Sequence, residues 1–186
     1  MAATGLKNIH VALITETGGV ITYAAPRKIA EAITANITPN VESAVLYGDD
    51  RAVETEETLA DIDVEINVTD LSVEDYAFLL GATVDANGGV TDSINNVAPY
   101  VALGFEIPLT RGGKRMYWYY KGKFQIPSSE HTTKQGSTEF QTPTIAAKFL
   151  ARADGKWRYR LDANETNAAV VSAWFTAVQE EPTETP

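Results

Sequence analysis

Cysteine is absent from this chain of 186 residues, so disulfides, thiolate metal sites and cysteine nucleophiles are excluded. Basic residues are scarce as well: 15 lysines and arginines stand against 25 aspartates and glutamates, and the formal net charge is −10. A protein that binds nucleic acid tightly neutralises phosphates with clustered lysine and arginine side chains. The composition therefore argues against tight DNA binding, although it allows a protein that surrounds DNA without holding it.

Long apolar runs are also lacking. No stretch approaches the roughly 18 consecutive apolar residues that a membrane-spanning helix requires, and residues 1–7 do not have the basic and apolar regions of a signal peptide. We therefore expect a soluble protein that is made in a cytoplasm and has no membrane partner. Length and composition fit one domain over residues 1–179, followed by a short, acidic, disordered tail over residues 180–186.

Motifs that carry chemistry are few. His10 and His131 lie far apart without ligand-like neighbours, and there is no G-x-S-x-G nucleophile motif. The clearest candidate is a row of carboxylates, Asp61, Asp63 and Glu65, whose neighbours would lie about 6.5–7 Å apart on one strand. That spacing overlaps the spacing of paired glycosidase acids, but nothing in the sequence desolvates one of them. We expect a solvated acidic face, no catalysis, and neither a metal nor a cofactor.

Alternation with a period of two dominates the chain and predicts β-strands. Residues 61–68 alternate strictly between apolar and polar side chains, and residues 29–38 alternate less strictly. The predicted core side chains of these two strands are Ile62, Val64, Ile66, Ile29, Ile33 and Ile37. The opposite, polar faces hold Asp61, Asp63, Glu65, Asn67, Thr34 and Asn36.

Glycine-rich turn signals separate the strand-like segments, for example at residues 112–113 and 154–155. Because such turns join neighbouring antiparallel strands, the fold is predicted to be mainly β, an antiparallel sandwich or barrel. One α-helix over about residues 72–80 flanks it: Ser72 caps its start and Gly81 ends it. The core face of that helix contains Tyr76 and Leu80, and a weaker helix candidate spans residues 168–178.

Two polar segments are too long for a compact monomer, namely residues 38–58 and residues 127–142. Neither buries enough apolar area to offset its ordering entropy, so each would gain order by lying on a neighbouring subunit. We predict a long inter-subunit arm or loop at about residues 38–58. Its candidate contact residues are Val41, Val45, Leu46, Tyr47, Asp49 and Asp50.

Six blocks of sequence carry a resemblance to a known family. They are GLKNIH at residues 5–10, ITPNVESAVLYGDD at 37–50, APYVALGF at 98–105, YYKGKF at 119–124, FQTPTI at 140–145 and DGKW at 154–157. In this order they resemble the major tail proteins of long-tailed phages and prophages, the phi13-type group. The likeness spans about residues 4–162 and is weaker after residue 166.

The resemblance implies a tail tube fold, a β-sandwich with a flanking helix that is shared with the tube proteins of type VI secretion. It implies hexameric rings that stack into a hollow tube, an inter-ring arm, and a channel through which genomic DNA passes without specific binding. The implied partners are other copies of the chain and the tail terminator, tape measure and distal tail proteins of the virion. The polar residues of the two alternating strands are then candidates for the channel lining, although alternation alone does not separate a channel face from an outer face.

A second hypothesis stays open on the residues alone. The aromatic segment over residues 117–124 would suit a carbohydrate- or cell-surface-binding β-sandwich, such as a decoration or adhesion domain. That hypothesis requires exposed aromatic side chains on a monomer or small oligomer.

Overall fold

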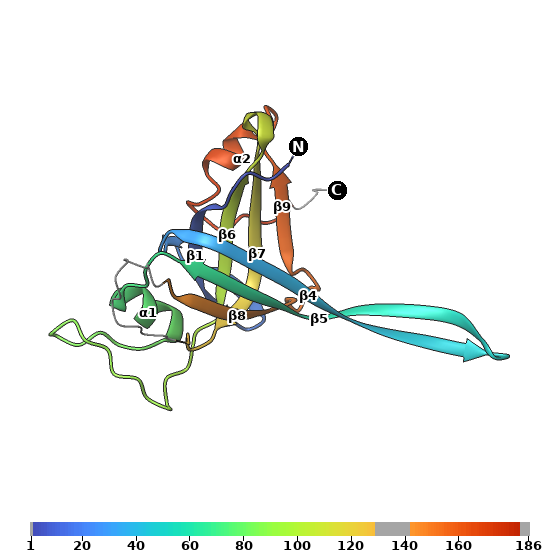
Figure 1. The fold of residues 1–186 in the computed structure, drawn as a ribbon, viewed down its shortest axis with the longest axis horizontal. Helices are drawn as coiled ribbons and strands as arrows, with labels where there is room; N and C mark the ends of the chain where they lie inside the picture. Colours follow the sequence, from blue (N-terminus) through green and yellow to red (C-terminus); the bar gives the residue numbers. More distant parts are fainter. Residues whose placement is uncertain (1, 129–141, 183–186) are drawn as a thin grey trace, which may run out of the picture.

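A computed structural model describes residues 2–128 and 142–182 of the chain (Figure 1). Within these residues the strands are β1 (Lys7–Thr17), β2 (Val20–Tyr23), β3 (Arg27–Lys28), β4 (Ala32–Gly48), β5 (Arg51–Val68), β6 (Val101–Pro108), β7 (Lys114–Phe124), β8 (Thr144–Leu150) and β9 (Arg158–Asp162). The helical elements are α1 (Val73–Leu80), the 3-10 turn η1 (Thr110–Gly112) and α2 (Ala168–Ser172). The strands pair in the order β2-β1-β6-β7-β8-β5-β4, while β3 pairs with β1 and β9 with β7. The prediction of a mainly β, antiparallel fold with a flanking helix is confirmed.

Strand β7 belongs to both layers of the fold. Along one of its edges, residues 115–119 pair with β9 and residues 121–124 pair with β8, while β6 occupies the other edge. The sheet therefore turns over at β7, so that β8, β5 and β4 pack across β1 and β6 (Figure 1). The main hydrophobic core lies between the two layers and holds buried side chains from both.

The main core contains most of the side chains that alternation assigned to it. They are Ile29, Ile62, Val64, Ile66 and Leu80, all of which are buried. Tyr76 and Ile37 are half-buried and pack against this core. Over residues 61–68 of β5 the alternation is complete, because one face of the strand lies under the second layer and the other face does not.

Ile33 does not belong to the core, because 50% of its surface is exposed. The cause is a β-bulge at the start of β4: Ala32 pairs with Val68 and Thr34 pairs with Asn67, so Ile33 is left without a partner in the ladder. An extra residue in one strand reverses the alternation beyond it. Ala32 packs against the core instead, and the prediction for Ile33 is wrong.

A second, smaller core lies on the opposite face of β1, β6 and β7, and the C-terminal segment covers it. Trp118 points into it from β7 and Trp174 from the segment that follows α2, and both are 0% exposed. The Nε1–H of Trp118 donates a hydrogen bond to the carbonyl oxygen of Trp174 at 3.2 Å. The weaker helix candidate is thus a short helix, α2, followed by turns that end on this core.

Helix α1 begins and ends where the sequence predicts. Ser72 Oγ accepts a hydrogen bond from the backbone N–H of Asp75 at 3.1 Å, and Gly81 adopts the left-handed φ of 69° that ends many helices. The carboxylate of Asp75 accepts a hydrogen bond from Arg27 at 2.7 Å, which ties the helix to β3. The helix thereby covers one end of the main core, into which Leu79 and Leu80 pack.

The segment predicted as an arm or loop is a long β-hairpin. Strands β4 and β5 pair from Ala32 and Val68 to Gly48 and Arg51, and Figure 1 shows their distal half projecting from the body. We call residues 41–59 the arm. Asp49 and Asp50 form its turn with φ values of 49° and 61°, as expected of a type I′ hairpin turn.

The start of the C-terminal tail is held by ion pairs. Glu180 pairs with Arg152, and Glu181 pairs with Lys156 at 3.0 Å. Disorder of residues 180–186 stays a prediction, and residues 183–186 lie outside the described part of the chain. Most of the second polar segment, residues 129–141, also lies outside it. Among the residues that the structure describes, no helix is long and apolar enough to cross a membrane.

Candidate functional site

The outward face of β4, β5, β8 and the end of β7 is almost entirely polar, and we call it the polar sheet face. It contains all six predicted channel-lining residues, Asp61, Asp63, Glu65, Asn67, Thr34 and Asn36. Thr38 and Asn40 of β4, Thr144 and Lys148 of β8, and Lys123 and Gln125 at the end of β7 complete it. The structure thus brings the predicted residues together on one surface, opposite the main core.

A hydrogen-bonded network joins three strands on the polar sheet face. The Nδ2 of Asn40 lies 2.6 Å from Asp61 Oδ1 and 2.7 Å from Asp63 Oδ2. The Nζ of Lys148 lies 2.9 Å from Asp61 Oδ2 and 3.1 Å from Asp63 Oδ1. The bonds from Asn40, followed by those from Lys148, lower the pKa of both carboxyl groups, and the same carboxylates raise the pKa of Lys148.

The paired-acid hypothesis finds no support in this geometry. A general acid needs a carboxyl group whose pKa is raised so that it still holds a proton near neutral pH. The pKa values of Asp61 and Asp63 are both shifted the other way, because donors surround the charged forms. Over residues 2–128 and 142–182, no three His, Cys, Asp or Glu side chains cluster so as to hold a metal ion.

Lysine side chains moderate the charge of this face, and the sequence analysis missed them. Cross-strand pairing places Lys148 opposite Asp63 and Lys123 opposite Lys148. Three carboxylates and two ammonium groups therefore share the face, which leaves it weakly rather than strongly acidic. Residues of β8 and β5 are far apart in the chain, so only the register of the sheet reveals this neutralisation.

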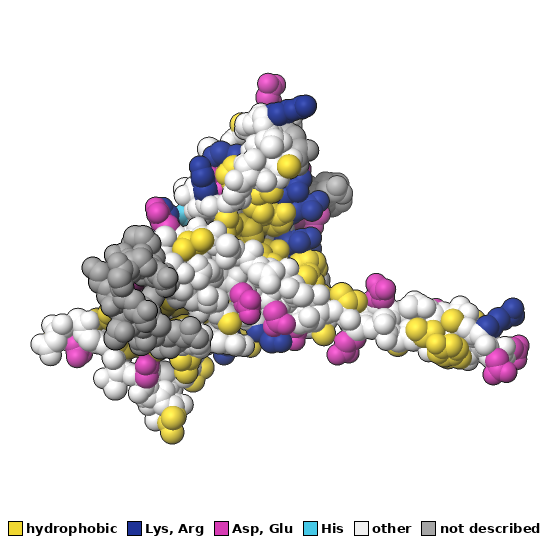
Figure 2. Space-filling model, in the orientation of Figure 1, with side chains coloured by type: hydrophobic (Ala, Val, Ile, Leu, Met, Phe, Trp, Pro, Cys, Tyr) yellow, Lys and Arg dark blue, Asp and Glu magenta, His cyan; other side chains and the backbone are white. Residues whose placement is uncertain are grey.

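The arm carries an apolar face of its own. Because residues opposite each other in an antiparallel pair share a face, Val41 and Leu59 lie on the same side as Val45 and Tyr47, a set that we call the apolar arm face. Tyr47 is 70% exposed, and Val53, in the bulge beside it, is 63% exposed. Leu46 lies on the opposite face among glutamates. Figure 2 shows hydrophobic side chains gathered near the end of the arm next to acidic ones.

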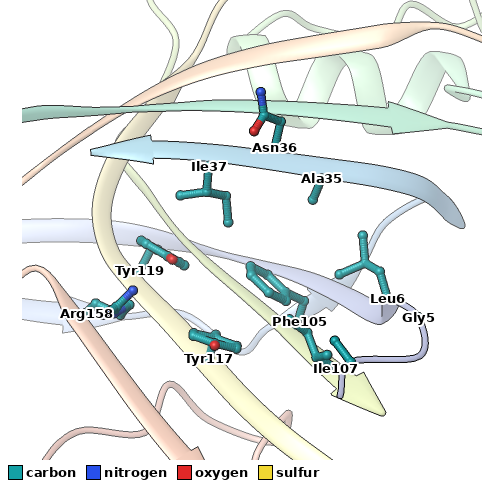
Figure 3. A pocket seen from close by; sticks show the side chains of 11 residues that line it. Gly5, Leu6, Ala35, Asn36, Ile37, Phe105, Ile107, Tyr117, Tyr119 and Arg158 are labelled. Atoms are coloured by element: carbon teal, nitrogen blue, oxygen red, sulfur yellow. The ribbon is translucent and has the colours of Figure 1, made fainter. Parts of the chain in front are cut away.

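An aromatic cleft opens on the body between β4 and β9 (Figure 3). This aromatic cleft has a volume of about 410 Å³. The residues that line it include Leu6, Ile37, Phe105, Tyr117, Tyr119 and Arg158. The ring of Phe105 stacks on those of Tyr117 and Tyr119, with centroids 5.1 and 6.0 Å apart. Burial raises the pKa of Tyr119, while the hydrogen bond from Arg158 opposes the shift. In Figure 2 hydrophobic side chains lie over this part of the body, bordered by lysine and arginine.

The aromatic strand that supported a carbohydrate-binding domain is buried rather than exposed. Trp118, Tyr119 and Tyr120 are 0, 3 and 1% exposed, and their rings belong to the two cores. A sugar-binding platform needs an accessible aromatic face, so this hypothesis loses its main support.

The described residues thus combine a β-sandwich body, a projecting hairpin arm and a polar sheet face. Comparison with family models identifies the class of protein: the chain belongs to the phage tail tube protein family, whose model matches residues 1–175. The match includes the whole arm and ends just after Trp174 in the second core, so it extends beyond the blocks that carried the resemblance. A comparison with curated proteins finds no match.

Proposed function

We propose that six copies of this chain form a ring and that stacked rings form the hollow tail tube through which the genome passes from capsid to host cell. The observation that carries the proposal is the open edge of β4, which pairs only with β5 among the described residues. An unpaired strand edge is a template for further pairing. Copies that join edge to edge around a channel would cover such edges with one another.

The polar sheet face lines the channel in this proposal, with Asp61, Asp63 and Glu65 toward the DNA and Asn67, Thr34 and Asn36 beside them. Double-stranded DNA carries one negative charge per ~1.7 Å of its axis. A weakly acidic wall repels it within a Debye length of ~8 Å. Lys148 is engaged by two carboxylates, so it offers phosphates little attraction. DNA would therefore slide along this surface without sticking.

The arm bridges neighbouring rings, and the two ends of the tube are completed by other tail proteins. A terminator protein would close one end of the tube, a tape measure protein would set its length, and a distal tail protein would extend the other end. The mature protein resides in the virion tail after synthesis in the host cytoplasm. None of these roles requires catalysis or a cofactor.

Size-exclusion chromatography and negative-stain electron microscopy of the purified chain at high concentration test the proposal. We expect rings or tubes with a stain-filled central channel. A matched variant in which residues 42–58 are replaced by Asn-Gly serves as the control and should form no tubes. A wild-type chain that stays monomeric and binds glycans would contradict the proposal and restore the adhesion hypothesis.

A further inference from the structure

We propose that the apolar arm face of one copy binds in the aromatic cleft of a second copy of this chain. The inference rests on the proposed function, because it names the surface that receives the arm. It uses two separate surfaces, neither of which is covered by the part of the chain that the structure describes. The cleft is built from the N-terminal segment and strands β4, β6, β7 and β9, whereas the arm is the distal part of the β4–β5 hairpin.

The arm needs a partner to be stable. From Val41 to its turn it is a two-stranded ladder without a third strand among the described residues, and an isolated hairpin is at best marginally stable in water. Eight residues at about 3.3 Å each give it a reach of about 26 Å. Its exposed Val45, Tyr47 and Val53 form the kind of contiguous apolar surface that marks an interaction site.

The cleft offers the complementary environment. Its floor consists of the stacked rings of Phe105, Tyr117 and Tyr119, and its rim is the unpaired edge of β4. A volume of about 410 Å³ lies in the range of cavities that take up large side chains or small ligands. An aromatic side chain such as Tyr47 would enter the cleft against the half-buried ring of Tyr117, with its hydroxyl group toward solvent.

The charges of the two surfaces are opposite. Residues 41–59 contain six acidic side chains and one basic side chain, so the arm carries a net charge of 1 − 6 = −5. Beside the cleft, Arg158 and Arg160 of β9 lie opposite Tyr119 and Tyr117 in the ladder, on the face that borders it. Neither arginine forms an ion pair within residues 2–128 and 142–182. Complementary potentials of this kind select partners and fix their register.

The symmetry of the contact fits an assembly that grows. Arm and cleft are different patches on the same chain, so the contact between them is heterologous. Each copy then offers a free arm and a free cleft to further copies. When the arm of each copy binds the cleft of the next copy in one direction, repetition of the contact gives either a closed ring or an open stack.

Site-directed cross-linking tests the contact directly, because the chain has no native cysteine. A Val53→Cys variant is mixed with a Gly5→Cys variant at high concentration and treated with a short thiol-to-thiol cross-linker. Gly5 lines the cleft, and an added side chain there meets no atom within 4 Å. We expect a cross-linked dimer in this mixture. The control mixture pairs Val53→Cys with Ile94→Cys, on a fully exposed loop, and should give none.

A charge swap tests the specificity of the same contact. Arg160→Glu should abolish the cross-link, Glu57→Arg should also abolish it, and the double variant, swapped on both partners, should restore it. All of the substituted positions are exposed, and a side chain at Gly5 has free space around it, so each variant should fold. Circular dichroism checks this.

The outcomes separate the inference from the proposed function. Tubes that form without a cross-link between arm and cleft, or with a cross-link to Ile94→Cys instead, overturn the inference and leave the tube intact. A cross-link without rings or tubes supports the contact and contradicts the tube. Absence of both overturns both.

Discussion

The ammonium nitrogen of Lys148 lies 2.9 Å from a carboxylate oxygen of Asp61, although 87 residues separate them in the chain. The same nitrogen lies 3.1 Å from Asp63, and Asn40 donates to both carboxylates from the other side. β4, β5 and β8 are therefore joined on their outward face by polar groups, in addition to their backbone ladders. This arrangement makes the stability of the polar sheet face depend on pH.

We predict that Asn40→Ala destabilises the protein at neutral pH and has little effect in acid. The folded-state pKa values of Asp61 and Asp63 are lowered, first by Asn40 and then by Lys148. The stability from these bonds is therefore fully present above the unfolded pKa of about 3.9 and is lost as the pH falls through the lowered folded values. Urea unfolding at neutral pH and near pH 2 measures both differences. Thr38→Ala, two residues earlier on the same face, is the control and should show no such pH dependence.

Gly122→Ala should destabilise the body by about 1–3 kcal/mol through overpacking. A Cβ atom at Gly122 would lie 2.5 Å from the ring of Phe149, which is 0% exposed. Gly5→Ala is the matched control, because nothing lies within 4 Å of its Cβ position. Its unfolding free energy should stay within about 0.5 kcal/mol of the wild type. Equal urea midpoints for the two variants would refute the close packing of β7 on β8.

Removal of the arm should separate folding from assembly. Val41 and Leu59 are cross-strand partners, so replacing residues 42–58 by Asn-Gly closes the hairpin with a favoured two-residue turn. The buried residues of both cores remain, since none lies in the deleted segment. We expect near-ultraviolet circular dichroism like that of the wild type and a chain that forms single rings at most and no tubes. Tubes of normal length from the shortened chain would show that the arm is dispensable for stacking.

Charge on the polar sheet face should affect DNA passage rather than assembly. Glu65 lies opposite Ala146, so Glu65→Lys reverses a charge without breaking the network around Lys148. We expect tubes of normal appearance and slower DNA release from virions that carry the variant, because the new ammonium groups attract phosphates. Glu65→Gln, which removes the charge without reversing it, should have a smaller effect. Identical release kinetics for Glu65→Lys and the wild type would place this face away from the DNA.

The elements that the sequence predicts best are those in which local patterns and burial agree. The strict alternation around Val64 fixes the faces of β5, because a slip of one residue would expose every core side chain. Helix α1 follows from Ser72 and Gly81, whose cap geometries are local. The family resemblance agrees with both, and the polar residues of β5 lie on one face as expected.

The sequence does not reveal where a β-bulge interrupts a strand or which strands pair with each other. A bulge in β4 exposes Ile33. A second irregularity lies in β7, because Val101 pairs with Gly122 whereas Leu103 pairs with Tyr119. As a result, the side chains of Lys121 and Tyr119 lie on opposite faces of the sheet. The turn at residues 154–155 forms, but the strands on either side of it pair with β7 and not with each other. Such features depend on long-range register, which leaves no local pattern.

The arm and the charge balance of the polar sheet face show the same limit. An acidic segment of low hydrophobicity suggests a loop, yet its apolar residues become one face only after β4 and β5 pair. Likewise, Lys148 and Asp63 become neighbours only through the register of β8 on β5.

A cryo-electron microscopy reconstruction of the assembled tube tests the central claim most directly. The account predicts six copies in each ring, with Asp63 and Glu65 on the wall of the channel and β4 paired with a strand of the next copy. A tube in which these carboxylates lie on the outer surface, or copies that touch without sharing strand edges, would contradict it.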